Sequence, residues 1–593
     1  MDRFIDEANE LVERKYRFNN PWDMECCDEP YQLVNGHAYY SPNGDPEWCY
    51  MFARLEFLRK FLLAYNDTKD KTYIEAYIQN VTQFYSENTI KNGQLKKSPI
   101  TLFGKALRKC KTKIQAYMPN QKTRHATYRT LDTAIRNYTL LCDLYCFEVL
   151  NNNADYRSFL LERLSVDMPF TIEDLFEFDF YSNWGLIRLS LYISCKLMNG
   201  DNDIIAYLEP LKVMLNKQIR IDGGHIECSL MYHMQVLICL LRMLNQMHLA
   251  GIEDVDIEAT TKEMALYAYH LSDSNNNQIM YGDSDYTNID TVMAIAEGVL
   301  QLEYRLHIAC PTDRMLLVEF QNLKFDESKP LLQKLNREWI GGTYVINETQ
   351  YQIRFFNETT NSNHKHADNG SVVLYYKKKP VLIDTGRCTY HDDKMRKYYK
   401  GAFGHNVAVV DDGAEWDFQS KWRFTEHPNV IENKLAGDSI IAAYGFGKRK
   451  IEHKRILYVN KEAVVIVSLV ACEGKHDLTT IWNISDGIDY KTIDDTLYFY
   501  VDTDKLHMKW YPNSDVKSQG GRISYHYNED RHTGLQIIVK TPFVNTGISI
   551  AVISDTDYTY EDNREEFTLV FKTGSIKIDK RSGLITKHTE FPA

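Results

Sequence analysis

Residues 364–371, His-Lys-His-Ala-Asp-Asn-Gly-Ser, combine side chains that can bind a metal or transfer a proton. His364 and His366 are two positions apart, and on an extended strand such a pair points to the same side. One imidazole could then bind a metal while its neighbour faces a substrate. The alternative is a polar loop that enters a strand, where histidines cap or hydrogen-bond. The pair by itself leaves both interpretations open.

The aromatic composition is compatible with carbohydrate binding. The chain has 40 tyrosines and 8 tryptophans. Flat aromatic faces and phenol hydroxyls line carbohydrate clefts, because sugars offer apolar C–H faces ringed by hydroxyls. An aromatic-rich core explains the same composition equally well, so this signal needs support from specific residues.

Charge, hydropathy and cysteine usage limit the class of protein. The net charge of −12 argues against nucleic-acid binding, although a local cluster of cations can still bind an anionic substrate. No run of about 18 apolar residues is present, so we expect no membrane span. The N-terminus does not resemble a signal peptide, and the 12 cysteines include no Cys-x-x-Cys pair. These features predict a cytoplasmic protein, or a periplasmic or secreted one if a leader has been removed.

The first half of the chain has the apolar spacing of amphipathic helices. Breaks rich in Asn, Asp and Gly separate the helical segments. Repeated helix–turn–helix pairs predict a helical domain over residues 1–325, either an α-solenoid or an α/α toroid. The expected helices are Trp48–Tyr65, Thr72–Phe84, Leu131–Leu150, Trp184–Met198, Ile204–Ile219, Leu230–Leu249 and Glu258–Ser272.

After residue 335 the apolar period becomes two, which indicates β-strands. A dozen or more strands without intervening helices predict an antiparallel β-sandwich over residues 335–593. The expected strands include Tyr344–Ile346, Tyr351–Phe356, Val372–Tyr376, Val381–Asp384, Arg455–Val459, Ala463–Val470, Leu497–Val501, Leu535–Val539, Ile548–Ile553, Phe567–Phe571 and Ser575–Ile578.

Several polar clusters interrupt the helical half. Arg129, Asp132 and Arg136 fall on one helical face, where an ion pair within the helix explains them as well as anion binding does. Tyr232 lies just inside a helix that follows a Gly-Gly turn, so it can face a cleft, although a single tyrosine among so many usually packs.

The order of these motifs resembles the heparinase II/III superfamily of polysaccharide lyases. The resemblance covers the chain from about residue 20 to the C-terminal sandwich, and the segment Ser41–Trp48 is most similar to the heparinase III branch. It implies an N-terminal incomplete α/α toroid followed by a C-terminal antiparallel β-sandwich. The motifs that carry it are Asp45-Pro46-Glu47-Trp48, Tyr128–Arg136, Ser182-Asn183-Trp184, Asp222–His233 and His364–Asp368.

The resemblance also implies catalytic roles. Asn183 matches the asparagine that binds the uronate carboxylate, Tyr232 the catalytic acid or base, and His364 a histidine that joins the catalysis. β-Elimination removes the C5 proton of a uronate, and donors that neutralise its carboxylate stabilise the developing charge. Tyr232 or His364 takes the proton, and Tyr232 donates one to the departing C4 oxygen. The uronate epimer decides which residue is the base, so both assignments stay open.

The same resemblance implies a structural zinc ion, bound by His366, Asp384 and His405. Two histidines and one aspartate are chemically sound zinc ligands, with water or another group in the fourth position. No organic cofactor is expected.

Further residues are candidates for binding substrate. The guanidinium groups of Arg129 and Arg136 fit carboxylate or sulfate. His225 lies in the turn before Tyr232, while Glu47 and Trp184 belong to the motifs that carry the resemblance. His233 points away from Tyr232 on the helix and is expected to pack.

The leading hypothesis is therefore a lyase that cleaves a heparan-sulfate-like glycosaminoglycan by β-elimination. Alternatives are a lyase of alginate or another acidic glycan, a non-catalytic carbohydrate-binding protein with a structural zinc, and a zinc hydrolase, for which no general base stands out. The expected partner is an acidic polysaccharide or oligosaccharide, with neither nucleic acid nor membrane. The oligomeric state stays open between monomer and homodimer.

Overall fold

The chain forms two compact units, which we describe from a computed structural model. It describes residues 3–589 apart from 39, 89–125, 174, 340, 348, 359–361, 437 and 513. Unit 1 comprises residues 1–218, 235–262 and 290–330, and unit 2 comprises residues 219–234, 263–289 and 331–593. The last change between units, after Pro330, falls between the two predicted domains. Residues 219–234 and 263–289 also belong to unit 2, although the predicted limits assigned them to the N-terminal domain.

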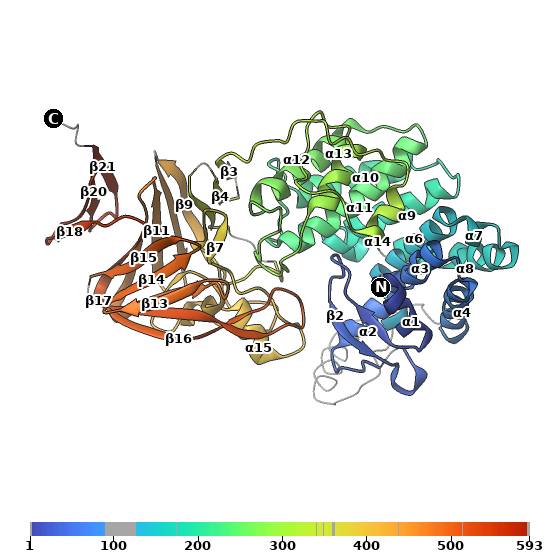
Figure 1. Cartoon of the computed structure of the whole chain (residues 1–593), viewed down its shortest axis with the longest axis horizontal. Coiled ribbons are helices and arrows are strands. Elements are labelled where there is room, and N and C mark those ends of the chain that lie inside the picture. The colour runs from blue at the N-terminus through green and yellow to red at the C-terminus, as the bar shows by residue number, and fades with distance from the viewer. Residues whose placement is uncertain are drawn as a thin grey trace. The chain divides into compact units, whose positions relative to one another are not determined.

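Unit 1 is built from helices, together with one short hairpin of β1 (Tyr16–Phe18) and β2 (Cys27–Tyr31) (Figure 1). Helix α6 packs against α8 and α9, and α9 against α10. None of the helices in the described ranges is long and apolar enough to cross a membrane. The helices are α1 (Arg3–Val12), α2 (Pro46–Arg54), α3 (Arg59–Thr68), α4 (Lys71–Glu87), α6 (Thr130–Cys146), α7 (Glu148–Asn151), α8 (Ala154–Ile172), α9 (Asn183–Met198), α10 (Ile205–Gln218), α13 (Asp290–Val299) and α14 (Arg314–Leu317).

Helices α11 (Leu230–Leu249) and α12 (Val255–Leu271) each contribute residues to both units. Most expected helices agree with the structure within a few residues. The single helix expected over residues 48–65 is wrong, because the chain breaks at Leu55 into α2, a 3₁₀ turn and α3. Leu55 has the left-handed conformation (φ +59°), and its N–H bonds the carbonyl of Phe52. Its side chain is buried, which explains why the apolar spacing continues through the break.

Unit 2 is dominated by antiparallel sheets (Figure 1). Its one helix within 331–589 among the described residues, apart from short 3₁₀ turns, is α15 (Asp393–Lys400). The large sheet contains β3 (Arg337–Trp339), β4 (Thr343–Ile346), β5 (Tyr351–Phe356), β6 (Ser371–Tyr376), β7 (Lys379–Leu382), β8 (Ala408–Val410), β9 (Asn429–Ala436), β10 (Ser439–Phe446), β11 (Ile451–Val459), β12 (Ala463–Ile484), β13 (Asp489–Ile493), β14 (Thr496–Val501), β15 (Asp504–Tyr511), β16 (Asp515–Ile523) and β17 (Arg531–Ser554).

A smaller sheet follows, with β18 (Thr559–Asp562), β19 (Glu566–Phe571), β20 (Gly574–Asp579) and β21 (Ile585–Thr589). Strand β12 shows how the layers stack. Val464 and Ile466 belong to one buried apolar cluster, whereas Val465 and Val467 belong to a second cluster that includes side chains of the smaller sheet. Because successive side chains of a strand point to opposite faces, β12 is covered on both sides. This explains its almost continuous apolar sequence.

Two predicted strands, Leu535–Val539 and Ile548–Ile553, are parts of the single long strand β17. The intervening residues remain paired with β12, and even Pro542 lies opposite Asp477 in the ladder. His364 and His366 lie in a loop, the second of the two interpretations that the sequence left open. These histidines lie in the connection between β5 and β6, and we call residues 362–370 the His-Lys-His loop.

Candidate active site and metal centre

Both histidines of the His-Lys-His loop contact one buried carboxylate, that of Asp283. His364 Nδ1 lies 2.8 Å from Oδ2 of Asp283, and His366 Nε2 lies 2.7 Å from its Oδ1. The backbone N–H of Asp283 in turn donates to the carbonyl of His364 at 3.1 Å. The two imidazole rings therefore point to the same carboxylate, as the sequence spacing predicted, although they lie in a loop and not on a strand.

Arg396 completes the surroundings of Asp283. Its guanidinium donates to both carboxylate oxygens, with Nη2 2.8 Å from Oδ2. Burial alone would raise the pKa of Asp283, but Arg396 and the two histidines outweigh it and hold the pKa well below its usual range. The carboxylate is therefore ionised and accepts from both rings.

Helix α15 packs against the His-Lys-His loop and supports it. Asp392 caps its N-terminus by accepting from the N–H groups of Lys394 and Met395. Residues four apart share a helical face, and here that face carries Arg396 and Lys400. Lys400 Nζ donates to the carbonyls of Asn363 and Lys365. One helix thus anchors both Asp283 and the backbone of the His-Lys-His loop.

Tyr232 stacks directly on His364, with ring centroids 3.6 Å apart and planes at 23°. The tyrosine lies in the first turn of α11. The hydroxyl of Ser284 accepts from the N–H of Met231 at 3.0 Å, and the hydroxyl of Ser229 donates to the carbonyl of Asp283 at 2.7 Å. These bonds tie the start of α11 to the segment that carries Asp283, which brings Tyr232 against His364.

A second phenol contacts the hydroxyl of Tyr232. The Tyr390 hydroxyl lies 3.2 Å from it and accepts from Arg387 at 3.0 Å. Arg387 is itself paired with both oxygens of Asp285, at 2.7 and 2.9 Å. Tyr232 therefore sits between a histidine ring and a phenol–guanidinium pair, an arrangement that can accept, hold or donate a proton.

His225 and Glu227, in the turn before α11, lie near the same histidine. Glu227 Oε2 is 3.7 Å from His364 Nε2. His225 Nδ1 accepts from the N–H of Glu227 at 3.2 Å, and its buried Nε2 has no hydrogen-bond partner within the described part of the chain. Burial, followed by the nearby His233 and Arg220, holds the pKa of His225 well below its usual value, so the ring is neutral. As predicted, His233 packs, with Nε2 2.9 Å from the carbonyl of Met264.

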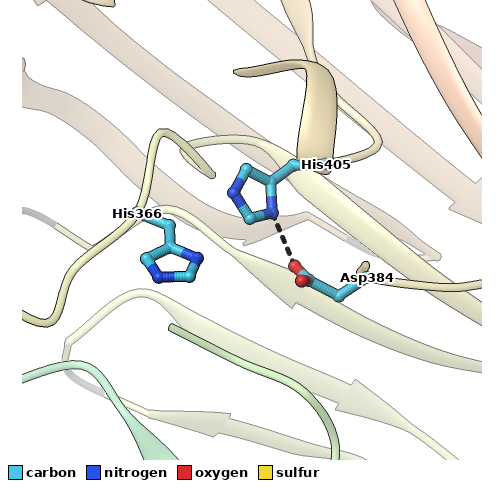
Figure 2. A group of neighbouring side chains, drawn as sticks. All are labelled: His366, Asp384 and His405. Carbon is cyan, nitrogen blue, oxygen red and sulfur yellow. Dashed lines mark hydrogen bonds and ion pairs between the residues drawn. The ribbon is translucent and has the colours of Figure 1, made fainter. Parts of the chain in front are cut away.

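The three predicted metal ligands converge in the interior of unit 2 (Figure 2). One donor atom from each of His366, Asp384 and His405 lies within 4.8 Å of the others. Asp384 follows β7, and His405 follows a short 3₁₀ turn (Ala402–Gly404). Asp384 Oδ2 accepts from His405 Nδ1 at 2.7 Å, the contact dashed in Figure 2.

Two buried imidazole nitrogens of this cluster are unpaired within the part of the chain that the structure describes. His366 Nδ1 and His405 Nε2 are buried and have no hydrogen-bond partner among the described residues. The opposite nitrogen of His366 donates to Asp283, as metal-binding histidines commonly do toward a carboxylate. Two imidazole nitrogens and a carboxylate oxygen match the ligands that zinc prefers.

Of the other predicted residues, Asn183 is the first residue of α9 in unit 1, directly after the cap residue Ser182. Arg129 lies over the rings of Tyr50 and Trp184, 3.6 and 4.9 Å from their centroids. It also forms the ion pair with Asp132 that the helical spacing allowed.

Glu47 belongs to the same group in unit 1. Burial and the nearby Glu25 raise its pKa to about 8, while Arg129 lowers it. Arg136 does not join this group. Its side chain is fully buried and donates to the carbonyls of Ala53 and Thr127. The structure gives Arg136 a structural role within unit 1 and no support as a substrate ligand.

Sequence reasoning missed Asp283, Arg387, Tyr390 and Arg396. Asp283 and Asp285 are carboxylates spaced by two beside Gly282, and this spacing was the one signal in the sequence that pointed to this loop. Arg387 and Arg396 can be distinguished from the other arginines of the chain only once their burial is known.

Comparisons with known proteins agree with this fold. The family model for the heparinase II/III-like C-terminal domain matches residues 340–581. A heparin-sulfate lyase of Bacteroides thetaiotaomicron is 21% identical over 169 residues, which cover 27% of this chain and 22% of that protein. The matched region thus spans about a fifth of that relative.

Among solved structures, heparinase III is 16% identical with a TM-score of 0.72, covering 99% of this chain and 91% of that chain. A mutant of heparan sulfate lyase HepC from Pedobacter heparinus is 14% identical with a TM-score of 0.62, covering 100% and 89%. These likenesses confirm the predicted incomplete α/α toroid followed by an antiparallel β-sandwich. Residues 340–581 are thus similar to the C-terminal domain of the heparinase II/III family, and the whole chain has the fold of the heparinase III structures.

Proposed function

We propose that this protein is a polysaccharide lyase that cleaves uronate-containing glycosaminoglycans of the heparan sulfate type by β-elimination. The observation that carries the proposal is the Tyr232–His364 stack, with the histidine held by an ionised carboxylate. The similarity of residues 340–581 to the heparinase II/III family and the relatives named as heparin-sulfate and heparan sulfate lyases support the same reaction class.

The hydrogen bonds define how His364 can act. Because Asp283 Oδ2 also accepts from Arg396, His364 Nδ1 donates to it, and Nε2 is the nitrogen of this ring that can take up a proton. Nε2 can therefore accept the C5 proton of a uronate, while the Tyr232 hydroxyl donates to the departing C4 oxygen. When the C5 proton and the C4 oxygen lie on the same face of the sugar ring, Tyr232 can instead remove the proton and then donate it to the C4 oxygen. In either case the electrons of the C5–H bond form the C4–C5 double bond as the C4–O bond breaks.

The uronate carboxylate needs donors that neutralise it before C5 can lose a proton. We assign this role to Asn183 from its match to the family motif, with Arg129, Glu47 and Trp184 as further contacts with the acidic glycan. His225 is a candidate donor beside Tyr232, because its Nδ1 accepts and its Nε2 must therefore carry the proton.

We also propose that His366, Asp384 and His405 hold a structural zinc ion. When bound, the metal would supply positive charge and link the His-Lys-His loop to the segment after β7 and to the segment after the 3₁₀ turn Ala402–Gly404. Because His366 lies in the His-Lys-His loop, these three ligands would keep the loop in place beside Tyr232. We further propose that the protein is cytoplasmic and that its substrates there are oligosaccharides.

A panel of acidic glycans tests the substrate class. Heparan sulfate, hyaluronan, chondroitin and alginate are incubated separately with the protein, and ultraviolet absorbance reports unsaturated uronates. We expect the fastest rise with heparan sulfate. A faster rise with alginate or chondroitin would move the proposal to another acidic glycan. Binding of heparan sulfate without any rise would favour a non-catalytic carbohydrate-binding protein.

A further inference from the structure

Asp283 makes a separate contact with each histidine of the His-Lys-His loop. Oδ2 accepts from His364, the residue proposed to transfer a proton, and Oδ1 accepts from His366, a proposed metal ligand. Arg396 spans the two oxygens and neutralises their charge. All four side chains belong to unit 2.

This shared carboxylate gives the two rings opposite tautomers. Both oxygens of Asp283 accept from the Arg396 guanidinium, so each is an acceptor and each histidine donates from the nitrogen that faces Asp283. His364 donates from Nδ1 and keeps its lone pair on Nε2. His366 donates from Nε2 and keeps its lone pair on Nδ1, the buried nitrogen that has no hydrogen-bond partner among the described residues. Asp283 therefore leaves the lone pair of His364 available for proton transfer and the lone pair of His366 available for the metal.

We propose that Asp283 is a positioning residue that sets the tautomer and orientation of both His364 and His366, and so couples metal binding to proton transfer. The inference rests on the proposed function. It assigns a role to a residue that lies 81 positions before His364 and belongs to a different segment of unit 2. Arg396 supports that role because it donates to both carboxylate oxygens and so limits rotation of the carboxylate.

The substitution Asp283→Asn separates this role from simple packing. The amide has nearly the same size but a single oxygen, so it can accept from only one histidine, and its NH2 group opposes the other. We expect the zinc dissociation constant, measured by competition with a chromophoric chelator, to rise about 10–100-fold. We expect kcat to fall by at least about 100-fold, since misorientation of a catalytic histidine has costs of that order, with KM changed by less than about threefold.

Zinc supplementation distinguishes the two halves of the inference. At saturating zinc the metal content of Asp283→Asn should return to about one equivalent, while kcat should stay low because the contact with His364 remains lost. Full recovery of kcat would mean that Asp283 acts through the metal alone and would overturn the coupling. An unchanged zinc affinity would overturn it from the other side.

Asp285→Asn is the matched control for zinc affinity. It lies in the same loop, is equally buried and is paired with Arg387 instead of with a histidine. Its zinc affinity should stay within about twofold of the wild type. If Asp283→Asn fails to fold, Arg396→Lys, which keeps the charge but not the bidentate geometry, should shift zinc affinity and kcat in the same directions. A wild-type protein that releases no unsaturated uronate would refute the proposed function, whereas the zinc comparison would still decide whether Asp283 sets His366.

Discussion

Tyr232 illustrates what residue types can and cannot reveal. Its sequence context, a Gly-Gly turn followed by a helix, allowed a catalytic role, but forty tyrosines allowed packing equally well. The structure places its ring against His364 and its hydroxyl beside that of Tyr390. These contacts give the phenol a path for its proton that a packed tyrosine would not need.

Tyr232→Phe keeps the ring stack and removes only the hydroxyl. Because positioned acid–base groups contribute about 10²–10⁴-fold, kcat should fall by at least about 100-fold while substrate binding stays measurable. Initial rates and glycan binding by calorimetry provide the test. Tyr560→Phe, at an exposed position of β18, is the control and should keep full activity. Substantial turnover in Tyr232→Phe would refute the proton-transfer role.

Glu47 gives a pH-dependent prediction. Its pKa is raised from 4.5 to about 8, first by burial and then by Glu25. A carboxyl with a raised folded-state pKa stabilises the protein fully below its unfolded value and loses that contribution as pH rises through the folded value. The loss should therefore occur between about pH 4.5 and pH 8.

Glu47→Gln, which stays neutral, should have a melting temperature close to that of the wild type at pH 4 and a higher one at pH 9. Thermal unfolding followed by circular dichroism at both pH values measures the difference. Glu75→Gln, at an exposed position of α4, serves as the control and should show no such pH-dependent gap. An equal difference between Glu47→Gln and the wild type at pH 4 and pH 9 would contradict the raised pKa.

At the scale of elements, the sequence predicts what depends on periodicity. The helices α9, α10 and α11 and the strands β5, β6 and β14 agree closely with the expected ranges, because each is a mainly apolar segment bounded by polar or turn residues. Leu55 and β17 differ because tertiary packing overrides local signals. Asp283 could not be predicted as part of the site, because its partners come from β-sandwich segments more than 80 residues away.

Gly386 connects an element to the metal cluster. It has a φ of +87°, and an added Cβ would lie 2.1 Å from the carbonyl of Ser524. Gly386 also donates its N–H to Asp384. Gly386→Ala should therefore displace Asp384, lower the melting temperature and weaken zinc binding.

Gly413→Ala is the matched control for that overlap. Gly413 has a φ of +78°, but its nearest neighbour would lie at an ordinary 3.6 Å. This variant should show only the backbone cost of about 1–2 kcal/mol and unchanged zinc affinity. Equal effects of the two substitutions on zinc affinity would show that the overlap at Gly386 is not coupled to the metal cluster.

At the scale of the whole molecule, a structural metal should stabilise unit 2 by mass action. Zinc at about 1,000 times its dissociation constant contributes about 4 kcal/mol to the free energy of unfolding. A chelator should therefore lower the melting temperature, and added zinc should restore it. His405→Ala, which removes one proposed ligand, should show neither change. Purified protein with far less than one equivalent of any divalent metal would count against a tight site.

The reaction class is tested most directly by the products. In β-elimination each cleaved bond yields one unsaturated uronate and one new reducing end, whereas hydrolysis yields reducing ends alone. Heparan sulfate digested by the protein should therefore give ultraviolet chromophore and reducing ends in a ratio of about one throughout the digestion. Reducing ends that accumulate without the chromophore would contradict the proposed lyase mechanism.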